Sequence, residues 1–132
     1  METLSKEAIS LFNSPGAPKV LATIDSLGSL NVVPKGSLSA INEKTLIYAE
    51  ISGGKTESNL KPGNRVSALA FTTSPLAGYQ AKGSFEGFQN QGPLFEKVAK
   101  KVKEMIHVDI RSVGVIKVEE VFSVAPTFVQ KK

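Results

Sequence analysis

Short β-rich runs separated by glycine, proline or polar turns fill most of the sequence, and this pattern constrains the fold more than any other feature. It predicts six strands, at residues 19–25, 30–38, 45–51, 65–73, 79–88 and 109–119. We expect the first three to form a meander. Helices are expected only at residues 4–13, 55–61 and 93–106. This balance predicts a mainly β fold, a six-stranded antiparallel barrel with capping helices, in which Gly83 and Gly87 mark bends.

The length and composition allow one domain, residues 1–132, and exclude several classes of protein. The chain has 132 residues, of which 41% are hydrophobic and 21% charged, and it has no cysteine. A disulfide framework, a thiol nucleophile and an iron–sulfur cluster are therefore excluded. No apolar run approaches the roughly 20 residues of a membrane span, and the first 11 residues contain acids and a lysine, unlike a secretory signal. We expect a cytoplasmic protein.

The net charge of +4 comes entirely from residues 97–132, which hold eight basic and four acidic side chains. Lys97, Lys100, Lys101 and Lys103 alternate with Leu94, Phe95, Val98, Val102, Met105 and Ile106, which recur at helical spacing. These lysines are expected on the solvated face of an amphipathic helix. The alternative is a binding module that uses this face and the terminal Lys131 and Lys132 on a polyanion. No aromatic residue is interleaved among the helix lysines, so nucleic acid is not the favoured partner.

Apolar residues near the C-terminus point to a second copy of the chain. The residues concerned are Val121, Phe122, Val124, Phe128 and Val129. A barrel this small exposes part of one wall, so these side chains need a cover. We therefore expect a homodimer.

The stretch Ser52-Gly53-Gly54-Lys55-Thr56 carries the clearest chemical signal. Two glycines permit a sharp turn, the helix that follows offers free N–H groups, and a lysine and a threonine stand beside them. This combination predicts a phosphate cradle. A nucleotide-triphosphate loop is excluded because Ala49 stands where its first glycine would fall and no later strand ends in the acidic residue that binds magnesium. The alternative is a glycine-rich turn with an incidental lysine.

Two further stretches could bind a ligand. In residues 31–37, Pro34 removes a ladder donor, which places it on an edge strand or at a break. Free backbone groups there, with Lys35 or Ser37, could bond to a planar ring, although this stretch taken alone favours an edge proline without a ligand. In residues 78–83, Tyr79 or Gln80 could contact a ring or serve packing alone.

The sequence lacks the residues that a hydrolytic catalytic site or a metal site requires. His107 is the only histidine, and there is no cysteine or paired carboxylate motif. We expect His107 at a helix C-terminus, where the helix dipole favours it.

The three stretches, in this order and spacing, resemble the FMN-binding split-barrel family related to pyridoxamine 5′-phosphate oxidase. The similarity runs from Leu21 through residues 31–37, 55–60 and 78–83 to about Val118. It implies a six-stranded split barrel that is homodimeric, with two flavin sites at the subunit interface. It also implies an FMN-binding flavoprotein, an oxidoreductase or electron-transfer protein acting on an unknown small molecule or redox partner.

The resemblance assigns cofactor-binding roles but no catalytic residue. It places Val33, Pro34 and Lys35 beside the isoalloxazine, with Ser37 close by. It places Lys55 and Thr56 at the FMN phosphate, with Ser52 and Asn59 near them, and it gives Gln80 to the site of the other subunit.

The chain departs from the oxidases of this family at its C-terminus. Those enzymes bind pyridoxal phosphate through a terminal arginine and histidine segment, whereas residues 125–132 contain neither. Pyridoxamine phosphate oxidase activity is therefore not expected. Relatives that bind haem or the deazaflavin F420 are the alternatives, with His107 as the one imidazole for haem.

Overall fold

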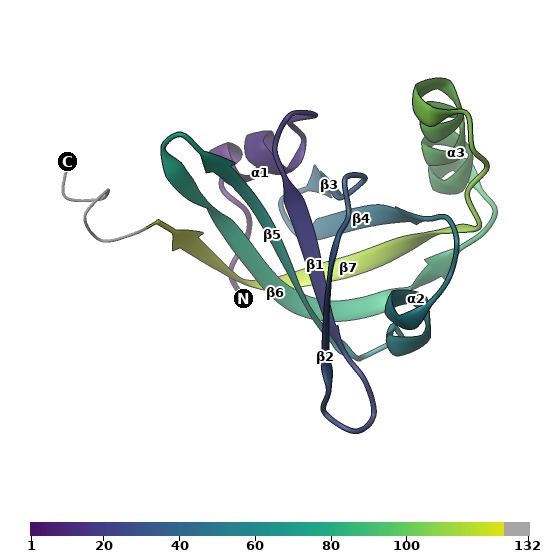
Figure 1. The fold of residues 1–132 in the computed structure, drawn as a ribbon, viewed down its shortest axis with the longest axis horizontal. Coiled ribbons are helices and arrows are strands. Elements are labelled where there is room, and N and C mark those ends of the chain that lie inside the picture. The colour runs from purple at the N-terminus through teal and green to yellow at the C-terminus, as the bar shows by residue number, and fades with distance from the viewer. Residues whose placement is uncertain (126–132) are drawn as a thin grey trace.

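The computed structural model describes residues 1–125, which form one antiparallel sheet with three helices (Figure 1). The sheet order is β2-β1-β5-β6-β7-β4-β3. The strands are β1 (Lys19–Ile24), β2 (Leu30–Pro34), β3 (Ser39–Asn42), β4 (Thr45–Glu50), β5 (Arg65–Thr73), β6 (Leu76–Gln89) and β7 (Ser112–Val124). The helices are α1 (Lys6–Phe12), α2 (Lys55–Asn59) and α3 (Pro93–Ile106). The mainly β antiparallel class is confirmed, with seven strands in the sheet instead of the predicted six.

The additional strand comes from residues 30–38, which were predicted as one strand. β2 ends at Pro34, the residue that cannot donate to a ladder, and β3 begins at Ser39. The predicted meander is also wrong. β1 and β2 form a hairpin at one edge of the sheet, whereas β3 and β4 form a second hairpin at the opposite edge.

The short connection between β2 and β3 forces the sheet to curl. These strands are the two outermost in the order, so a flat sheet would separate them by six spacings of about 4.8 Å, or roughly 29 Å. The chain from Pro34 to Ser39 makes five steps of at most about 3.6 Å each, or roughly 18 Å. The edges must therefore approach each other, which gives a barrel open between β2 and β3.

The glycines of β6 mark its irregularities, as predicted. The register of β6 against β7 shifts between Lys82 and Gly83 and again between Phe85 and Gly87. A Cβ at Gly83 would collide with the carbonyl oxygen of Lys117 on β7. These shifts bend the long β6–β7 pair. Both strands are internal to the sheet, because each pairs with a neighbour on either side.

The hydrophobic core has two parts. The larger fills the barrel beneath α1 and includes Phe12, Leu21, Leu38, Tyr48 and Phe85. The smaller lies between α3 and strands β4 and β7. The sheet contributes Ile47, Ala49, Val113 and Val115, the connection before β7 contributes Ile110, and the helix contributes Leu94, Phe95, Val98, Ala99 and Val102.

The amphipathic face of α3 is shorter than predicted. Lys97, Lys100, Lys101 and Lys103 are exposed as expected. Met105 and Ile106 are also exposed, at 63% and 55%, because the residues of α3 that pack against the smaller core end at Val102. His107 caps the C-terminus of α3 in a left-handed conformation, where it was predicted.

The C-terminal strand also differs from expectation. β7 continues to Val124, and Val121 packs against the larger core, so Val121 needs no external cover. Phe122 remains 40% exposed. Phe128, Val129, Lys131 and Lys132 lie outside the described residues. Within residues 1–125, no helix is long and apolar enough to cross a membrane.

Asn13, directly after α1, covers part of the β3 edge. Its Nδ2 donates to the carbonyl oxygen of Ala40 at 3.1 Å, and its Oδ1 accepts from the Ala40 N–H at 2.7 Å. One side chain thus pairs both backbone groups of an edge residue, which protects the edge and fixes α1 over the barrel.

We expect Asn13→Ala to lower the free energy of unfolding by about 1–3 kcal/mol, because it removes two hydrogen bonds from partly buried backbone groups. Urea denaturation followed by circular dichroism measures this, with Ser10→Ala on the exposed side of α1 as the control. Equal midpoints for the two variants would show that Asn13 does not secure α1.

Candidate functional site

The turn before α2 has the geometry that the sequence predicted. Gly53 and Gly54 both have positive φ, at 76° and 114°, which L side chains rarely adopt. The helix begins directly after them at Lys55, so its first N–H groups have no partner within the helix. Ser52 and Lys55 are exposed, whereas Thr56 is buried.

A set of four polar side chains fixes α2 against β1 and β2. Thr23 and Asn31 are direct cross-strand partners and therefore face the same side. Asn31 Nδ2 donates to Thr56 Oγ1 at 3.0 Å, and Asn59 Nδ2 donates to Thr23 Oγ1 at 3.1 Å. The predicted phosphate stretch and the predicted ring stretch are thus joined directly, although they are 25 residues apart in sequence.

This arrangement changes the roles available to two predicted site residues. The Thr56 hydroxyl oxygen and the Asn59 amide both serve the attachment of α2 to the sheet. Lys55 makes no ion pair with the described part of the chain, so its ammonium is available to an anion.

The edge strand β2 presents an apolar row to solvent. Leu30, Val32 and Pro34 alternate outward, and Leu30 and Val32 are 74% and 63% exposed. Their cross-strand partners on β1 are Ile24, Ala22 and Val20, which are half-buried on the same face. Val33 lies on the other face of the strand, opposite Leu21 of β1. β2 pairs only with β1 among the described residues, so one side of its backbone has no strand partner.

Lys35 and Ser37 lie in the connection between β2 and β3 and both contact β4. The Lys35 ammonium lies over the Tyr48 ring, 5.2 Å from its centroid. Ser37 Oγ accepts a hydrogen bond from the Ala49 N–H at 2.9 Å, which continues the pairing of β3 with β4 through a side chain. These contacts fix the connection at the open side of the barrel.

Gln80 lies apart from the edge strand β2. It lies on β6, three strands from β2, which corresponds to roughly 14 Å. Its Nε2 donates to Ser67 Oγ at 2.8 Å on β5. Through the register of β1, β5 and β6 it shares the outer face with Val20 and Pro34.

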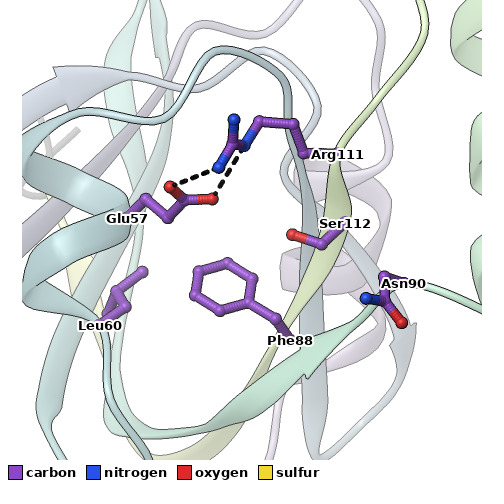
Figure 2. Close-up of a pocket in the computed structure, with 6 residues that line it drawn as sticks. All are labelled: Glu57, Leu60, Phe88, Asn90, Arg111 and Ser112. Atoms are coloured by element: carbon purple, nitrogen blue, oxygen red, sulfur yellow. Dashed lines mark hydrogen bonds and ion pairs between the residues drawn. The ribbon is translucent and has the colours of Figure 1, made fainter.

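An open pocket of about 680 Å³ lies beside α2 (Figure 2). Its lining consists of Glu57, Leu60, Phe88, Asn90, Arg111 and Ser112. Figure 2 shows the Glu57 carboxylate and the Arg111 guanidinium facing each other above the Phe88 ring. The guanidinium pairs with Glu57 through Nε at 3.2 Å and NH2 at 3.3 Å, and it lies against the Gly53 turn.

A buried pair of polar residues lies at the end of β4, shortly before the Gly53 turn. Tyr48 and Glu50 are both fully buried, and the Tyr48 hydroxyl donates to Glu50 Oε1 at 2.9 Å. Burial, followed by the negative charge of Glu50, raises the pKa of Tyr48 well above its usual value of 10.0.

The sequence did not reveal Tyr48, Glu50, Glu57, Phe88 or Arg111 as neighbours of the site. Glu57 and Arg111 are 54 residues apart, and no short motif connects them. The one available signal is Glu50, a charged residue at the end of an otherwise apolar strand.

Comparison with known proteins shows which solved structures share this architecture. A scan against protein-family models finds no match, and a search of curated protein sequences finds none either. Solved structures do match. HupZ of Group A Streptococcus is 29% identical, with a TM-score of 0.80 over 92% of this chain and 94% of that one.

Two other solved structures also share the fold. An FMN-binding protein from Syntrophomonas wolfei has a TM-score of 0.81 at 20% identity, over 92% of this chain and 86% of that one. A candidate pyridoxamine 5′-phosphate oxidase from Lactobacillus delbrueckii has a TM-score of 0.73 at 27% identity, over 92% and 99%. These neighbours confirm the resemblance to the FMN-binding split-barrel family.

The raised pKa of Tyr48 predicts a loss of stability at alkaline pH. The unfolded chain releases this proton near pH 10, whereas the folded protein retains it to higher pH. Above pH 10 the unfolded state therefore binds fewer protons, and the free energy of unfolding falls by about 1.4 kcal/mol per pH unit from this group. Urea unfolding between pH 9 and 11 should show this slope in wild type and a shallower one in Tyr48→Phe. Parallel curves would contradict the assignment.

Proposed function

We propose that the chain is a flavoprotein that binds FMN and exchanges electrons with a small molecule or a protein partner. The observation that carries this proposal is the hydrogen bond between Asn31 and Thr56, which joins a phosphate-type turn to an open strand edge. FMN has the matching form, a phosphate at one end and a flat ring at the other. When bound, the flavin supplies the electron transfer, and the protein supplies position and electrostatics.

The phosphate end fits the Gly53–Gly54 turn and the start of α2. The left-handed glycines, the unpartnered first N–H groups and the exposed Lys55 provide the donors that a dianion requires. A side chain at Gly53 would also come within 3.0 Å of Glu57 Oε1. Ser52 adds a hydroxyl to this turn. Thr56 and Asn59 contribute by holding α2 in place.

The ring end fits the edge of β2. The Lys35 N–H donates to the Lys19 carbonyl oxygen on β1, and the alternation of the ladder turns the backbone groups of Val33 toward β1 as well. The groups free on the unpaired side are therefore those of Val32 and the carbonyl oxygen of Pro34, which can bond to the polar edge of a planar ring. Pro34 donates nothing and presents an apolar surface. Ser37 holds the following connection against β4.

A second copy of the chain would complete the site. The outer row Leu30, Val32 and Pro34 is apolar and exposed beside the proposed ring position, so it needs a cover. Gln80 lies on the same outer face but too far away to reach the ring of its own subunit. In a symmetric dimer across this face, each subunit would supply Gln80 to the flavin of the other.

The absorbance spectrum of the purified protein and its titration with FMN test the proposal. We expect bands near about 370 and 450 nm, the usual flavin absorption, or their perturbation when FMN is added to the apoprotein. A colourless protein that ignores FMN overturns the proposal. Binding of haem or F420 in its place would redirect it to those cofactors, and a salt-steep shift of RNA would favour the lysine face of α3.

We expect Lys55→Ala to weaken FMN binding about tenfold or more, because it removes a charge-assisted bond to the phosphate. Quenching of flavin fluorescence measures the affinity. Lys61→Ala, an exposed lysine shortly after α2, is the matched control. Equal titration curves for the two variants would refute the role of Lys55.

We expect Val32→Glu to dissociate the dimer, because it places a charge in the centre of the proposed interface. Val32 is 63% exposed, so the fold of the subunit should not change. Sedimentation should give twice the chain mass of 14.1 kDa for wild type and the single mass for the variant. Leu27→Glu in the β1–β2 turn, at a residue 91% exposed, is the control. A wild-type monomer would contradict the proposed interface.

A further inference from the structure

Glu50 is a buried acidic side chain that no step of the proposed binding uses directly. It is the last residue of β4 and is fully buried. Its Oε1 accepts from the Tyr48 hydroxyl at 2.9 Å, and its Oε2 accepts from the Gly53 N–H at 3.1 Å. The two oxygens of one carboxylate thus connect a core residue to the first residue of the glycine turn.

Burying the Glu50 carboxylate costs free energy, so its contacts need an explanation. Desolvating an ionised group costs several kcal/mol unless its lone pairs are satisfied. Among the described residues Glu50 has no ion pair, and its side-chain partners are the neutral Tyr48 and Gly53. What a carboxylate offers over other side chains here is two acceptors at a fixed separation, one for each donor.

The Gly53 turn has few other restraints. Its glycines have left-handed backbone conformations and no side chain that could pack. The backbone N–H of Arg111 donates to the carbonyl oxygen of Glu50 at 2.7 Å, which fixes the end of β4 but not the turn itself. The Arg111 guanidinium lies against the turn, but it is the Glu50 side chain that bonds the Gly53 N–H to the core.

We propose that Glu50 is a positioning residue for phosphate binding. By holding the Gly53 N–H inward, it orders the turn so that the N–H groups at the start of α2, together with Lys55, keep the geometry that a phosphate requires. This inference rests on the proposed function and adds to it the device that preorganises the cradle.

Geometry and charge make opposite predictions for Glu50, which allows a sharp test. A negative charge near a phosphate repels it, so removal of the charge alone would tighten FMN binding. A Gly53 turn that is no longer held in one conformation would weaken FMN binding. The direction of the change in affinity therefore separates a positioning residue from one that acts only through its charge.

The experiment compares FMN with riboflavin, which lacks only the phosphate. We expect Glu50→Ala to lower the preference for FMN over riboflavin about tenfold, as for loss of a bond to a charged group. Glu50→Gln should retain the wild-type preference or exceed it, because its Oε1 can accept from Gly53 while its Nε2 donates to the Tyr48 hydroxyl oxygen. The affinity for riboflavin should be nearly the same in the wild type and in both variants.

Two further variants separate positioning from general destabilisation. Val113→Ala removes buried volume from the smaller core, on a strand next to β4, so it lowers the melting temperature without touching the turn. It should keep the full preference for FMN. Glu50→Asp is one methylene shorter and cannot reach both donors, so it should lose the preference, and it serves if Glu50→Ala does not fold.

The outcomes distinguish this inference from the proposed function. A wild-type protein that binds FMN no better than riboflavin overturns the phosphate cradle and the role of Glu50 with it. A wild-type preference that survives in Glu50→Ala or Glu50→Asp, or that increases in either, overturns the role of Glu50 alone. A preference that falls equally in Val113→Ala also overturns it.

Discussion

The four-residue connection between β2 and β3 is the constraint on which the rest of the structure depends. Because it joins the two edges of a seven-stranded sheet, the sheet cannot remain flat. The connection is also attached to β4, by Ser37 to the Ala49 N–H and by Lys35 above the Tyr48 ring. The closure brings β4 and the Gly53 turn toward β2, although the strand order of a flat sheet would leave them near opposite edges.

The attachment of α2 follows from that closure. A helix of five residues has little stability of its own, so side-chain contacts with the sheet must hold it. Thr23 and Asn31 face α2 because they are cross-strand partners in the edge hairpin, and they bond to Asn59 and Thr56. The same hairpin leaves its other face apolar and exposed. One edge of the barrel thus provides both the support for the cradle and the surface for a second copy.

Local patterns were sufficient to predict most of the strands but not their neighbours. The bends at Gly83 and Gly87 and the edge position of Pro34 follow from residue type, and all three were correct. The division of residues 30–38 into two strands was missed, because alternation does not show where a chain leaves one edge for another. The buried Tyr48–Glu50 pair and the Glu57–Arg111 pair depend on tertiary contacts, so no spacing in the sequence indicates them.

The charges around the Gly53 turn explain why its geometry matters so much. Lys55 and Arg111 are cations, whereas Glu50 and Glu57 are anions, so the formal charges of these four groups cancel. Arg111 is already paired with Glu57, which leaves little net field to attract a dianion. Affinity for a phosphate must then come from short, well-directed N–H contacts and the Lys55 ammonium. Such contacts weaken steeply with misalignment, so a turn without side chains needs a rigid support beneath it.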